Sequence, residues 1–214
     1  SPHSLAQDAR RHGVKVLTPD LNASADQAIL ESCDESIDGV AVRLGFSSVR
    51  GIGADLAFEI AAAGPYKDLE QLSRRTNASR KQLEALATAG AFGCFGFTRR
   101  EALWAVGAVA QSRSDRLRGI VTGASAPSLP GMSLREEAVS DLWATGIAPD
   151  GHPTRFVREV LKRRGVVTAS DLSNCEFRKV KVAGVVTHRQ RPATASGTVF
   201  VNLEDETGLI NVIV

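Results

Sequence analysis

The stretch SSVRGIGADLAFEI, residues 47–60, places two glycines one residue apart directly before an apolar run with helical spacing. Glycine has no Cβ and adopts positive φ angles at little cost, so Gly51 and Gly53 permit a tight turn whose backbone can approach another molecule closely. The free amides at the start of the following helix can donate hydrogen bonds to an anion. Two interpretations remain open at this point, a phosphate-binding turn and a plain turn between helices.

The order of turn, apolar-Gly-apolar-Gly and helix is similar to a helix-hairpin-helix motif. In that interpretation the amides after Gly53 bind phosphate oxygens, and Arg50 adds long-range attraction. Ile52 is expected to point inward and hold the hairpin on its helices.

A second helix, glycine-bearing turn and helix follow at residues 79–106, SRKQLEALATAGAFGCFGFTRREALWAV. Gly90 and Gly93 lie in the turn, and Arg99 and Arg100 open the last helix. Two such hairpins can contact the phosphates of both strands of a duplex without reading the bases. The sequence therefore predicts a tandem helix-hairpin-helix unit that binds duplex DNA.

The charge distribution agrees with a polyanion partner for this segment. The net charge of the 214-residue chain is +2, but residues 41–120 carry 12 Lys/Arg and 7 Asp/Glu, a net of +5. Residues 1–40 carry 3 and 7, a net of −4. A solvated basic face has the same composition, so charge alone does not decide between the two.

The pattern of apolar residues predicts an α+β fold in four parts. A small α/β unit is expected at 1–40, a tandem helix-hairpin-helix domain at 41–111, a linker with helices at 112–164, and a partial β-barrel at 165–214. SLREEAVSDLWATG predicts a helix in the third part, because Ser133 and Glu136 form a capping-box pair. No run of about 18 apolar residues and no signal-peptide pattern occurs, so we expect a cytoplasmic protein without a membrane partner.

The last part alternates apolar and polar residues in KVKVAGVVTHRQ, TVFVNLEDE and LINVIV, which matches the first strands of an oligonucleotide-binding barrel. The connection RQRPATASG is expected to present Arg189 and Arg191 on a loop, where they can contact a nucleic-acid backbone. Phe200 lies in the strand that follows. Solvent-exposed arginines and a core phenylalanine are the alternative interpretation.

The residues that commonly bind metals are scattered. Cys33, Cys94 and Cys175 are far apart and are expected to be small buried apolar residues. The four histidines are also dispersed, and no carboxylate pair has a framework for metal-assisted phosphoryl transfer. We therefore expect no metal site in the chain. The histidines are His3, His12, His152 and His188.

Five strings, VRLGFSSVRGIG, LATAGAFG, TRREALWAV, GHPTRFVR and VKVAGVVTHRQRPATASGTVFVNLEDETGLINVIV, resemble the C-terminal half of bacterial C-family DNA polymerases. The resemblance runs over nearly the whole chain. The loop HRQRPATASG and the string RREALW are more similar to the error-prone alpha-subunit-type members than to the replicative DNA polymerase III alpha subunit.

This resemblance implies that residues 1–40 end the fingers region, that the hairpins hold the duplex, and that the barrel lies near the template strand. It also implies catalytic aspartates and Mg²⁺ in a palm upstream of Ser1, and therefore no catalytic residue and no cofactor in this chain. Duplex and single-stranded DNA are the expected partners, together with accessory proteins of a translesion assembly. A noncatalytic helix-hairpin-helix and barrel scaffold of a repair or recombination protein is the alternative.

Overall fold

The computed structural model describes residues 2–111, 127, 129–149, 151–175, 179–192 and 197–214. The chain forms two compact units. One is Gly13–Pro149, and the other combines Ser1–His12 with Asp150–Val214. In the predicted linker region, 112–164, residues 112–126 and 128 lie outside the described residues.

A small mixed sheet begins the unit Gly13–Pro149. Its strands are β1 (Val16–Leu17), β2 (Ile29–Ser32) and β3 (Val40–Arg43), in the order β1-β3-β2, with β1 parallel and β2 antiparallel to β3. The sequence did not predict β2, because its strand pattern runs into the acidic segment ESCDESID. An acidic segment of this kind suggests a solvated loop. In the structure its first residues belong to β2, and Glu31 forms an ion pair of 2.6 Å with Arg43 in β3.

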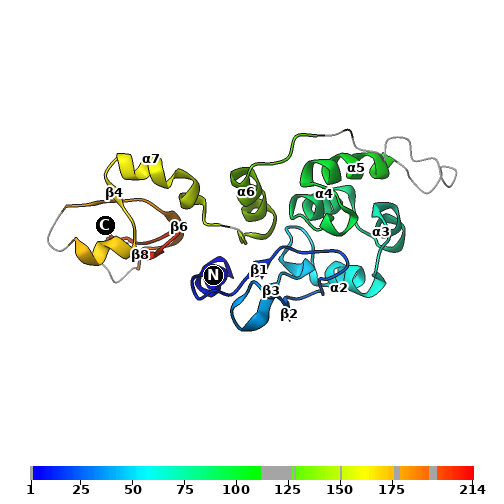
Figure 1. Cartoon of the computed structure of the whole chain (residues 1–214), viewed down its shortest axis with the longest axis horizontal. Coiled ribbons are helices and arrows are strands. Elements are labelled where there is room, and N and C mark those ends of the chain that lie inside the picture. Colours follow the sequence, from blue (N-terminus) through cyan, green and yellow to red (C-terminus); the bar gives the residue numbers. More distant parts are fainter. Residues whose placement is uncertain (1, 112–126, 128, 150, 176–178, 193–196) are drawn as a thin grey trace. The chain divides into compact units, whose positions relative to one another are not determined.

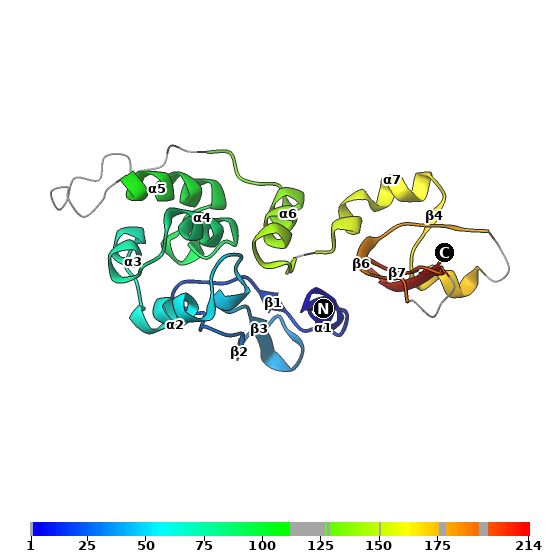
Figure 2. The ribbon, with the colours of Figure 1, turned by 180° about the vertical axis from the view of Figure 1, so that it is seen from behind.

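Helices α2–α5 gather beside this sheet (Figures 1 and 2). The largest buried side chains of this core are Phe46, Ile60, Leu72, Leu86 and Phe92. The helices of the unit are α2 (Ala54–Ala63), α3 (Leu69–Arg75), α4 (Arg80–Thr88), α5 (Arg99–Gln111) and α6 (Leu134–Thr145), with short 3₁₀ segments η1 (Ile37–Gly39), η2 (Phe46–Ser48) and η3 (Gly93–Phe95).

Local capping explains where several of these helices begin. Ser133 and Glu136 form the predicted capping box at the start of α6. Ser79 and Gln82 form another at α4, and the carboxylate of Asp68 accepts from the amide of Gln71 at α3. These side chains satisfy amides that have no partner within the helix.

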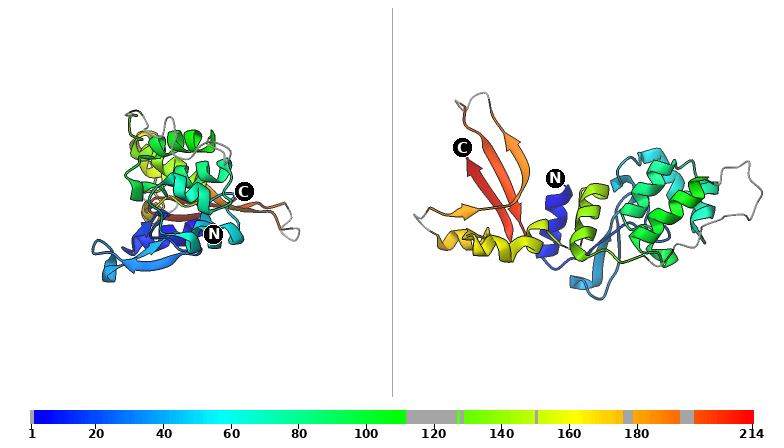
Figure 3. Two further views of the ribbon diagram at one scale, coloured as in Figure 1. Left: turned by 90° about the vertical axis from the view of Figure 1, so that its right-hand side faces the viewer. Right: turned by 90° about the horizontal axis from the view of Figure 1, so that it is seen from above.

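The second unit contains a three-stranded antiparallel sheet in the order β6-β7-β8 (Figure 3). Its strands β6 (Val185–Gln190), β7 (Phe200–Asp205) and β8 (Gly208–Ile213) agree with the alternating runs in the sequence. The other elements are α1 (Pro2–Arg11), η4 (Pro153–Val157), α7 (Arg158–Arg163), β4 (Val166–Val167), η5 (Ser170–Asn174) and β5 (Lys181–Val182). Strands β4 and β5 pair in parallel as a separate sheet.

The turn between β7 and β8 organises this unit. Oδ1 of Asp205 accepts from the amides of Thr207 and Gly208, and Oδ2 accepts from the amide of Ala169. Arg158, at the start of α7, binds both Asp205 and Glu206. Side chains that are distant in sequence therefore contact one another here and hold η4, α7 and the sheet in one unit.

The mixed helical and β architecture confirms the coarse expectation of an α+β fold. The two compact units do not end at the predicted boundaries 40, 111 and 164, because α1 belongs with β7 and the small sheet belongs with the helices. No helix among the described residues is long and apolar enough to cross a membrane. The cysteines are unpaired, but the prediction of burial was wrong: Cys94 is exposed, and Cys33 and Cys175 are half-buried.

Candidate nucleic-acid interface

The first hairpin presents its glycines to open space. Gly51 has a φ of +78°, which only glycine adopts without strain. A Cβ built on Gly51 or on Gly53 meets no atom within 4 Å, so both positions face away from the protein. Ile52 between them is 5% exposed, which confirms that it points inward. The backbone of this turn is thus accessible on one side and anchored on the other.

Helix α2 begins at this hairpin without a side-chain cap. Gly53 is its N-cap residue and forms no capping hydrogen bond, in contrast to Asp68, Ser79 and Ser133. The amides of the first turn are therefore available to a ligand, and the helix dipole favours an anion there. Asp55 in the same turn adds one opposing negative charge.

Two neighbouring helices fix the position of this hairpin. The amide of Arg50 donates to the carbonyl of Ala144 in α6 at 2.6 Å, and Nε2 of Gln82 in α4 donates to the carbonyl of Gly51 at 3.0 Å. The Arg50 guanidinium stacks over the Trp143 ring at 5.0 Å, and Arg50 remains exposed. The cation is held beside the open glycines by a cation–π contact.

The second hairpin differs from the first at its helix start. Thr98 and Glu101 cap α5 reciprocally, because Glu101 accepts from the Thr98 amide at 2.8 Å and the Thr98 hydroxyl accepts from the Glu101 amide at 3.3 Å. The hydrogen bond from the Thr98 amide lowers the pKa of Glu101 below its ordinary value. The protein itself thus occupies the amides that an anion needs at this end.

Arg99 is not presented to solvent. Its side chain is 11% exposed and forms an ion pair of 2.8 Å with Asp141, whose side chain is 1% exposed. The same guanidinium donates to the carbonyls of Thr88 and Glu137. Gly90, with a φ of +84°, leaves the space beside this guanidinium, since a Cβ there would lie 3.3 Å from Nε of Arg99. Arg99 and Gly90 therefore join α4, α5 and α6.

The remaining residues of the second hairpin are more accessible. Arg100 is about one-third exposed and pairs with Glu136 at 2.9 Å. Gly93 is exposed, and a Cβ there meets no atom within 4 Å. The sequence analysis predicted both Arg99 and Arg100 as DNA contacts, but only Arg100 is accessible at the surface.

The β-sheet separates two of the predicted contacts. Arg189 pairs with Val201, and Gln190 pairs with Phe200, in the antiparallel register of β6 and β7. Since successive side chains alternate between faces, Arg189 and Phe200 lie on opposite faces of the sheet. The expectation that Arg189 lies on a loop was wrong: it lies within β6, and only Arg191 follows the strand. Both arginines are exposed, and Phe200 is 37% exposed.

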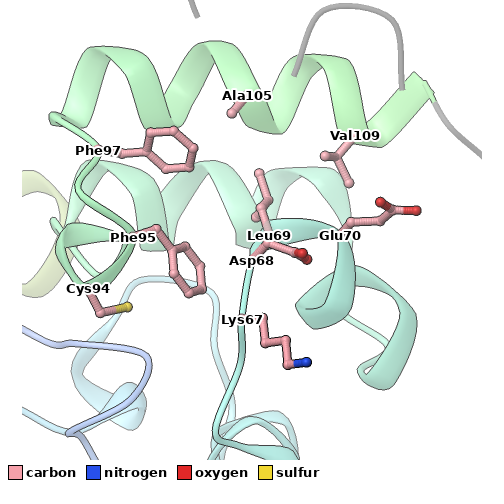
Figure 4. A pocket seen from close by; sticks show the side chains of 9 residues that line it. All are labelled: Lys67, Asp68, Leu69, Glu70, Cys94, Phe95, Phe97, Ala105 and Val109. Atoms are coloured by element: carbon pink, nitrogen blue, oxygen red, sulfur yellow. The ribbon is translucent and has the colours of Figure 1, made fainter. Parts of the chain in front are cut away.

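A separate cleft of about 460 Å³ opens between α3, η3 and α5. Figure 4 shows the rings of Phe95 and Phe97 pointing into it. Although Cys94 as a whole residue is exposed, partial desolvation of its sulfur at the edge of the cleft raises the pKa of the thiol and disfavours the reactive thiolate. The cleft is mainly apolar and lies apart from the glycines of the first hairpin.

Sequence reasoning missed the contribution of α6. Trp143 and Ala144 hold Arg50, and Asp141 neutralises Arg99, although these residues lie about 40–95 positions away from their partners. No local motif connects them, because the contacts arise from tertiary packing. It also missed His3, His152 and Glu204, which the structure brings together.

Comparison with known proteins finds one matching motif and a group of relatives. Residues 13–102 match the family model described as a helix-hairpin-helix motif, which includes the whole first hairpin. Proteins called error-prone DNA polymerase are 54% identical to the chain in Mycolicibacterium paratuberculosis, 51% in Mycobacterium tuberculosis strain H37Rv and 50% in Nocardia farcinica. Each alignment covers 100% of this chain.

The chain spans only 19–20% of the length of these relatives. This finding corrects the expectation that it is a C-terminal half, because a fifth of a relative is matched. Over its full length the chain is therefore similar to one segment of proteins called error-prone DNA polymerase, and its residues 13–102 match the helix-hairpin-helix motif.

Proposed function

We propose that this chain is a noncatalytic DNA-binding part of an error-prone DNA polymerase, and that it grips duplex DNA through the backbone of its first hairpin. The observation that carries the proposal is the open, uncapped helix start at Gly53. The other long helices of the same unit with described caps have a Ser at this position, so the missing side chain leaves room for a phosphate.

The grip is independent of base sequence. Amides after Gly53 donate to phosphate oxygens, and Arg50 supplies a cation beside them. Such contacts release counterions, so affinity for duplex DNA is expected to fall log-linearly with salt concentration. No base-reading side chain is needed for this mode of binding.

The two hairpins are proposed to contribute unequally to DNA binding. Thr98 and Glu101 cap the second helix start, and Arg99 is committed to Asp141. Gly93 and Arg100 remain accessible and form an auxiliary contact. This arrangement replaces the symmetrical pair of grips that the sequence suggested.

The finer assignments rest on the resemblance to the polymerases. In this proposal residues 1–40 end a fingers region, and the β6-β7-β8 meander begins an oligonucleotide-binding barrel that contacts single-stranded template. The catalytic carboxylates, their Mg²⁺ and the accessory proteins of a translesion assembly belong to the rest of the polymerase. Identity to polymerases along the full chain supports this reading over a repair or recombination scaffold.

The test is a substitution that should lower duplex affinity without lowering the stability of the protein. Gly53→Ser introduces the preferred N-cap side chain, which is expected to keep or raise helix stability by a few tenths of a kcal/mol. Its hydroxyl then occupies the amides that a phosphate needs. We expect the affinity for a duplex oligonucleotide, measured by fluorescence anisotropy, to fall at least about tenfold, because hydrogen bonds to charged groups contribute about 1.5–3 kcal/mol and about 1.4 kcal/mol is a factor of ten.

The matched control is Ser133→Gly, the opposite change at the N-cap of α6. It is expected to lower stability slightly and leave duplex affinity unchanged. Equal affinity of wild type and folded Gly53→Ser would show that the hairpin is a plain turn. Nucleotide incorporation by the purified chain in a primer-extension assay would contradict the noncatalytic part of the proposal.

A further inference from the structure

Three potential metal ligands meet in the unit formed by Ser1–His12 and Asp150–Val214. His3 comes from α1, His152 precedes η4, and Glu204 lies in β7. Their ligand atoms all lie within 4.8 Å of one another. His152 is 1% exposed and Glu204 is 0% exposed, which is unusual for groups of this polarity. Among the described residues this is the one such group that includes histidine.

The contacts around Thr154 occupy one ring nitrogen of His152. Nδ1 lies 2.7 Å from the Thr154 hydroxyl and accepts a hydrogen bond of 3.3 Å from the Thr154 amide. The Thr154 hydroxyl donates in turn to the carboxylate of Glu206. The ring nitrogen that remains for a ligand is Nε2.

Nε2 of His152 is buried without a partner. It makes no hydrogen bond within the part of the chain that the structure describes, and a buried polar atom without a partner is costly. A metal-binding histidine shows this arrangement, with one ring nitrogen held by a hydrogen bond and the other available to the metal.

The charged groups around the three ligands carry a net negative charge, which favours a cation. The carboxylates of Glu204, Asp205 and Glu206 face the guanidiniums of Arg11 and Arg158, so three negative and two positive charges leave a net of −1. Ser4 and Arg11 each bind one oxygen of Glu204, at 3.1 and 3.4 Å. Each carboxylate oxygen retains a second lone pair for a metal.

We propose that His3, Nε2 of His152 and Glu204 bind a divalent transition-metal ion of the zinc class. Two imidazoles and one carboxylate are an established ligand set for Zn²⁺, and water completes the coordination. Tetrahedral bonds of about 2.1 Å place donor atoms about 3.4 Å apart, so the ligands close by at most about 1.4 Å on binding. The ion links α1 to β7 and to the residue before η4.

The experiment uses the full chain with its cysteines alkylated by iodoacetamide, so that thiols cannot bind the probe. After EDTA treatment and dialysis, the protein is titrated with Co²⁺, followed by visible absorption, and then with competing Zn²⁺. We expect one ion per chain, a tetrahedral Co²⁺ spectrum and a higher Tm with Zn²⁺ than with EDTA. The variants are His3→Gln, His152→Gln and Thr154→Val. The controls are His12→Gln, directly after the helix that carries His3, and His188→Gln in β6.

Loss of either ligand is expected to abolish the spectrum, whereas both controls keep it. Thr154→Val should weaken Zn²⁺ affinity about 10–100-fold, because it removes the hydrogen bond that orients His152. Circular dichroism in EDTA identifies any variant that does not fold, and His3, which is only half-buried, provides the variant least dependent on core packing. Absence of a 1:1 complex, or a complex that survives both ligand changes in folded protein, overturns the proposal.

Discussion

The ion pair between Arg99 and Asp141 is expected to be a determinant of stability and not of DNA binding. Asp141→Ala leaves the guanidinium of Arg99 in a site where that side chain is 11% exposed. Removing one partner of a buried pair costs about 3–5 kcal/mol. At about 2–4 °C per kcal/mol for a protein of this size, the Tm should fall by about 6–20 °C.

The double variant Arg99→Met/Asp141→Leu tests the reason for this loss. Replacing both charges with apolar side chains is often neutral or stabilising, so most of the lost stability should return. Urea unfolding followed by circular dichroism gives the free energies, and anisotropy gives the duplex affinity of the folded double variant. Duplex affinity equal to wild type is expected. A folded double variant that binds duplex DNA at least tenfold more weakly would refute the assignment and restore Arg99 as a phosphate contact.

Two further predictions concern the other unit. Burial alone raises the pKa of Glu206, but hydrogen bonds from Arg158 and Thr154 dominate and lower it to about 2. A carboxyl with a depressed pKa stabilises the fold above its unfolded value near 4.5, so this contribution should be lost as the pH falls from about 5 to 2. Glu206→Gln should flatten that acid dependence in a thermal-denaturation series, and a profile identical to wild type would contradict it. Arg189→Gln and Arg191→Gln should each change stability by less than about 0.5 kcal/mol and lower the salt slope for single-stranded DNA by roughly 0.7, whereas unchanged slopes would make them surface charges without a DNA role.

Local patterns predicted local structure well. The capping box of Ser133 and Glu136 marks the start of α6, and period-2 alternation marks β6, β7 and β8. Strand β2 escaped prediction because Glu31 and its acidic neighbours suggest a loop, and only the pairing with Arg43 stabilises them in a strand.

The candidate sites were only partly predictable for the same physical reason. Gly51, Ile52 and Gly53 are adjacent, so their geometry follows from sequence. The burial of Arg99 depends on Asp141, and the histidine cluster depends on a contact between His3 and His152, which are 149 residues apart by number. Such contacts depend on packing between elements, which a single sequence does not display.

The hydrogen bond from the amide of Arg50 to the carbonyl of Ala144 has a consequence for synthesis on the ribosome. The acceptor lies 144 − 50 = 94 residues after the donor, and chains grow at about 5–20 residues per second. The first hairpin therefore emerges about 5–20 s before the residue that completes its support. During that interval Arg50 lacks its contacts with α6, so a chaperone or the nascent chain's own apolar segments have time to compete for the exposed turn.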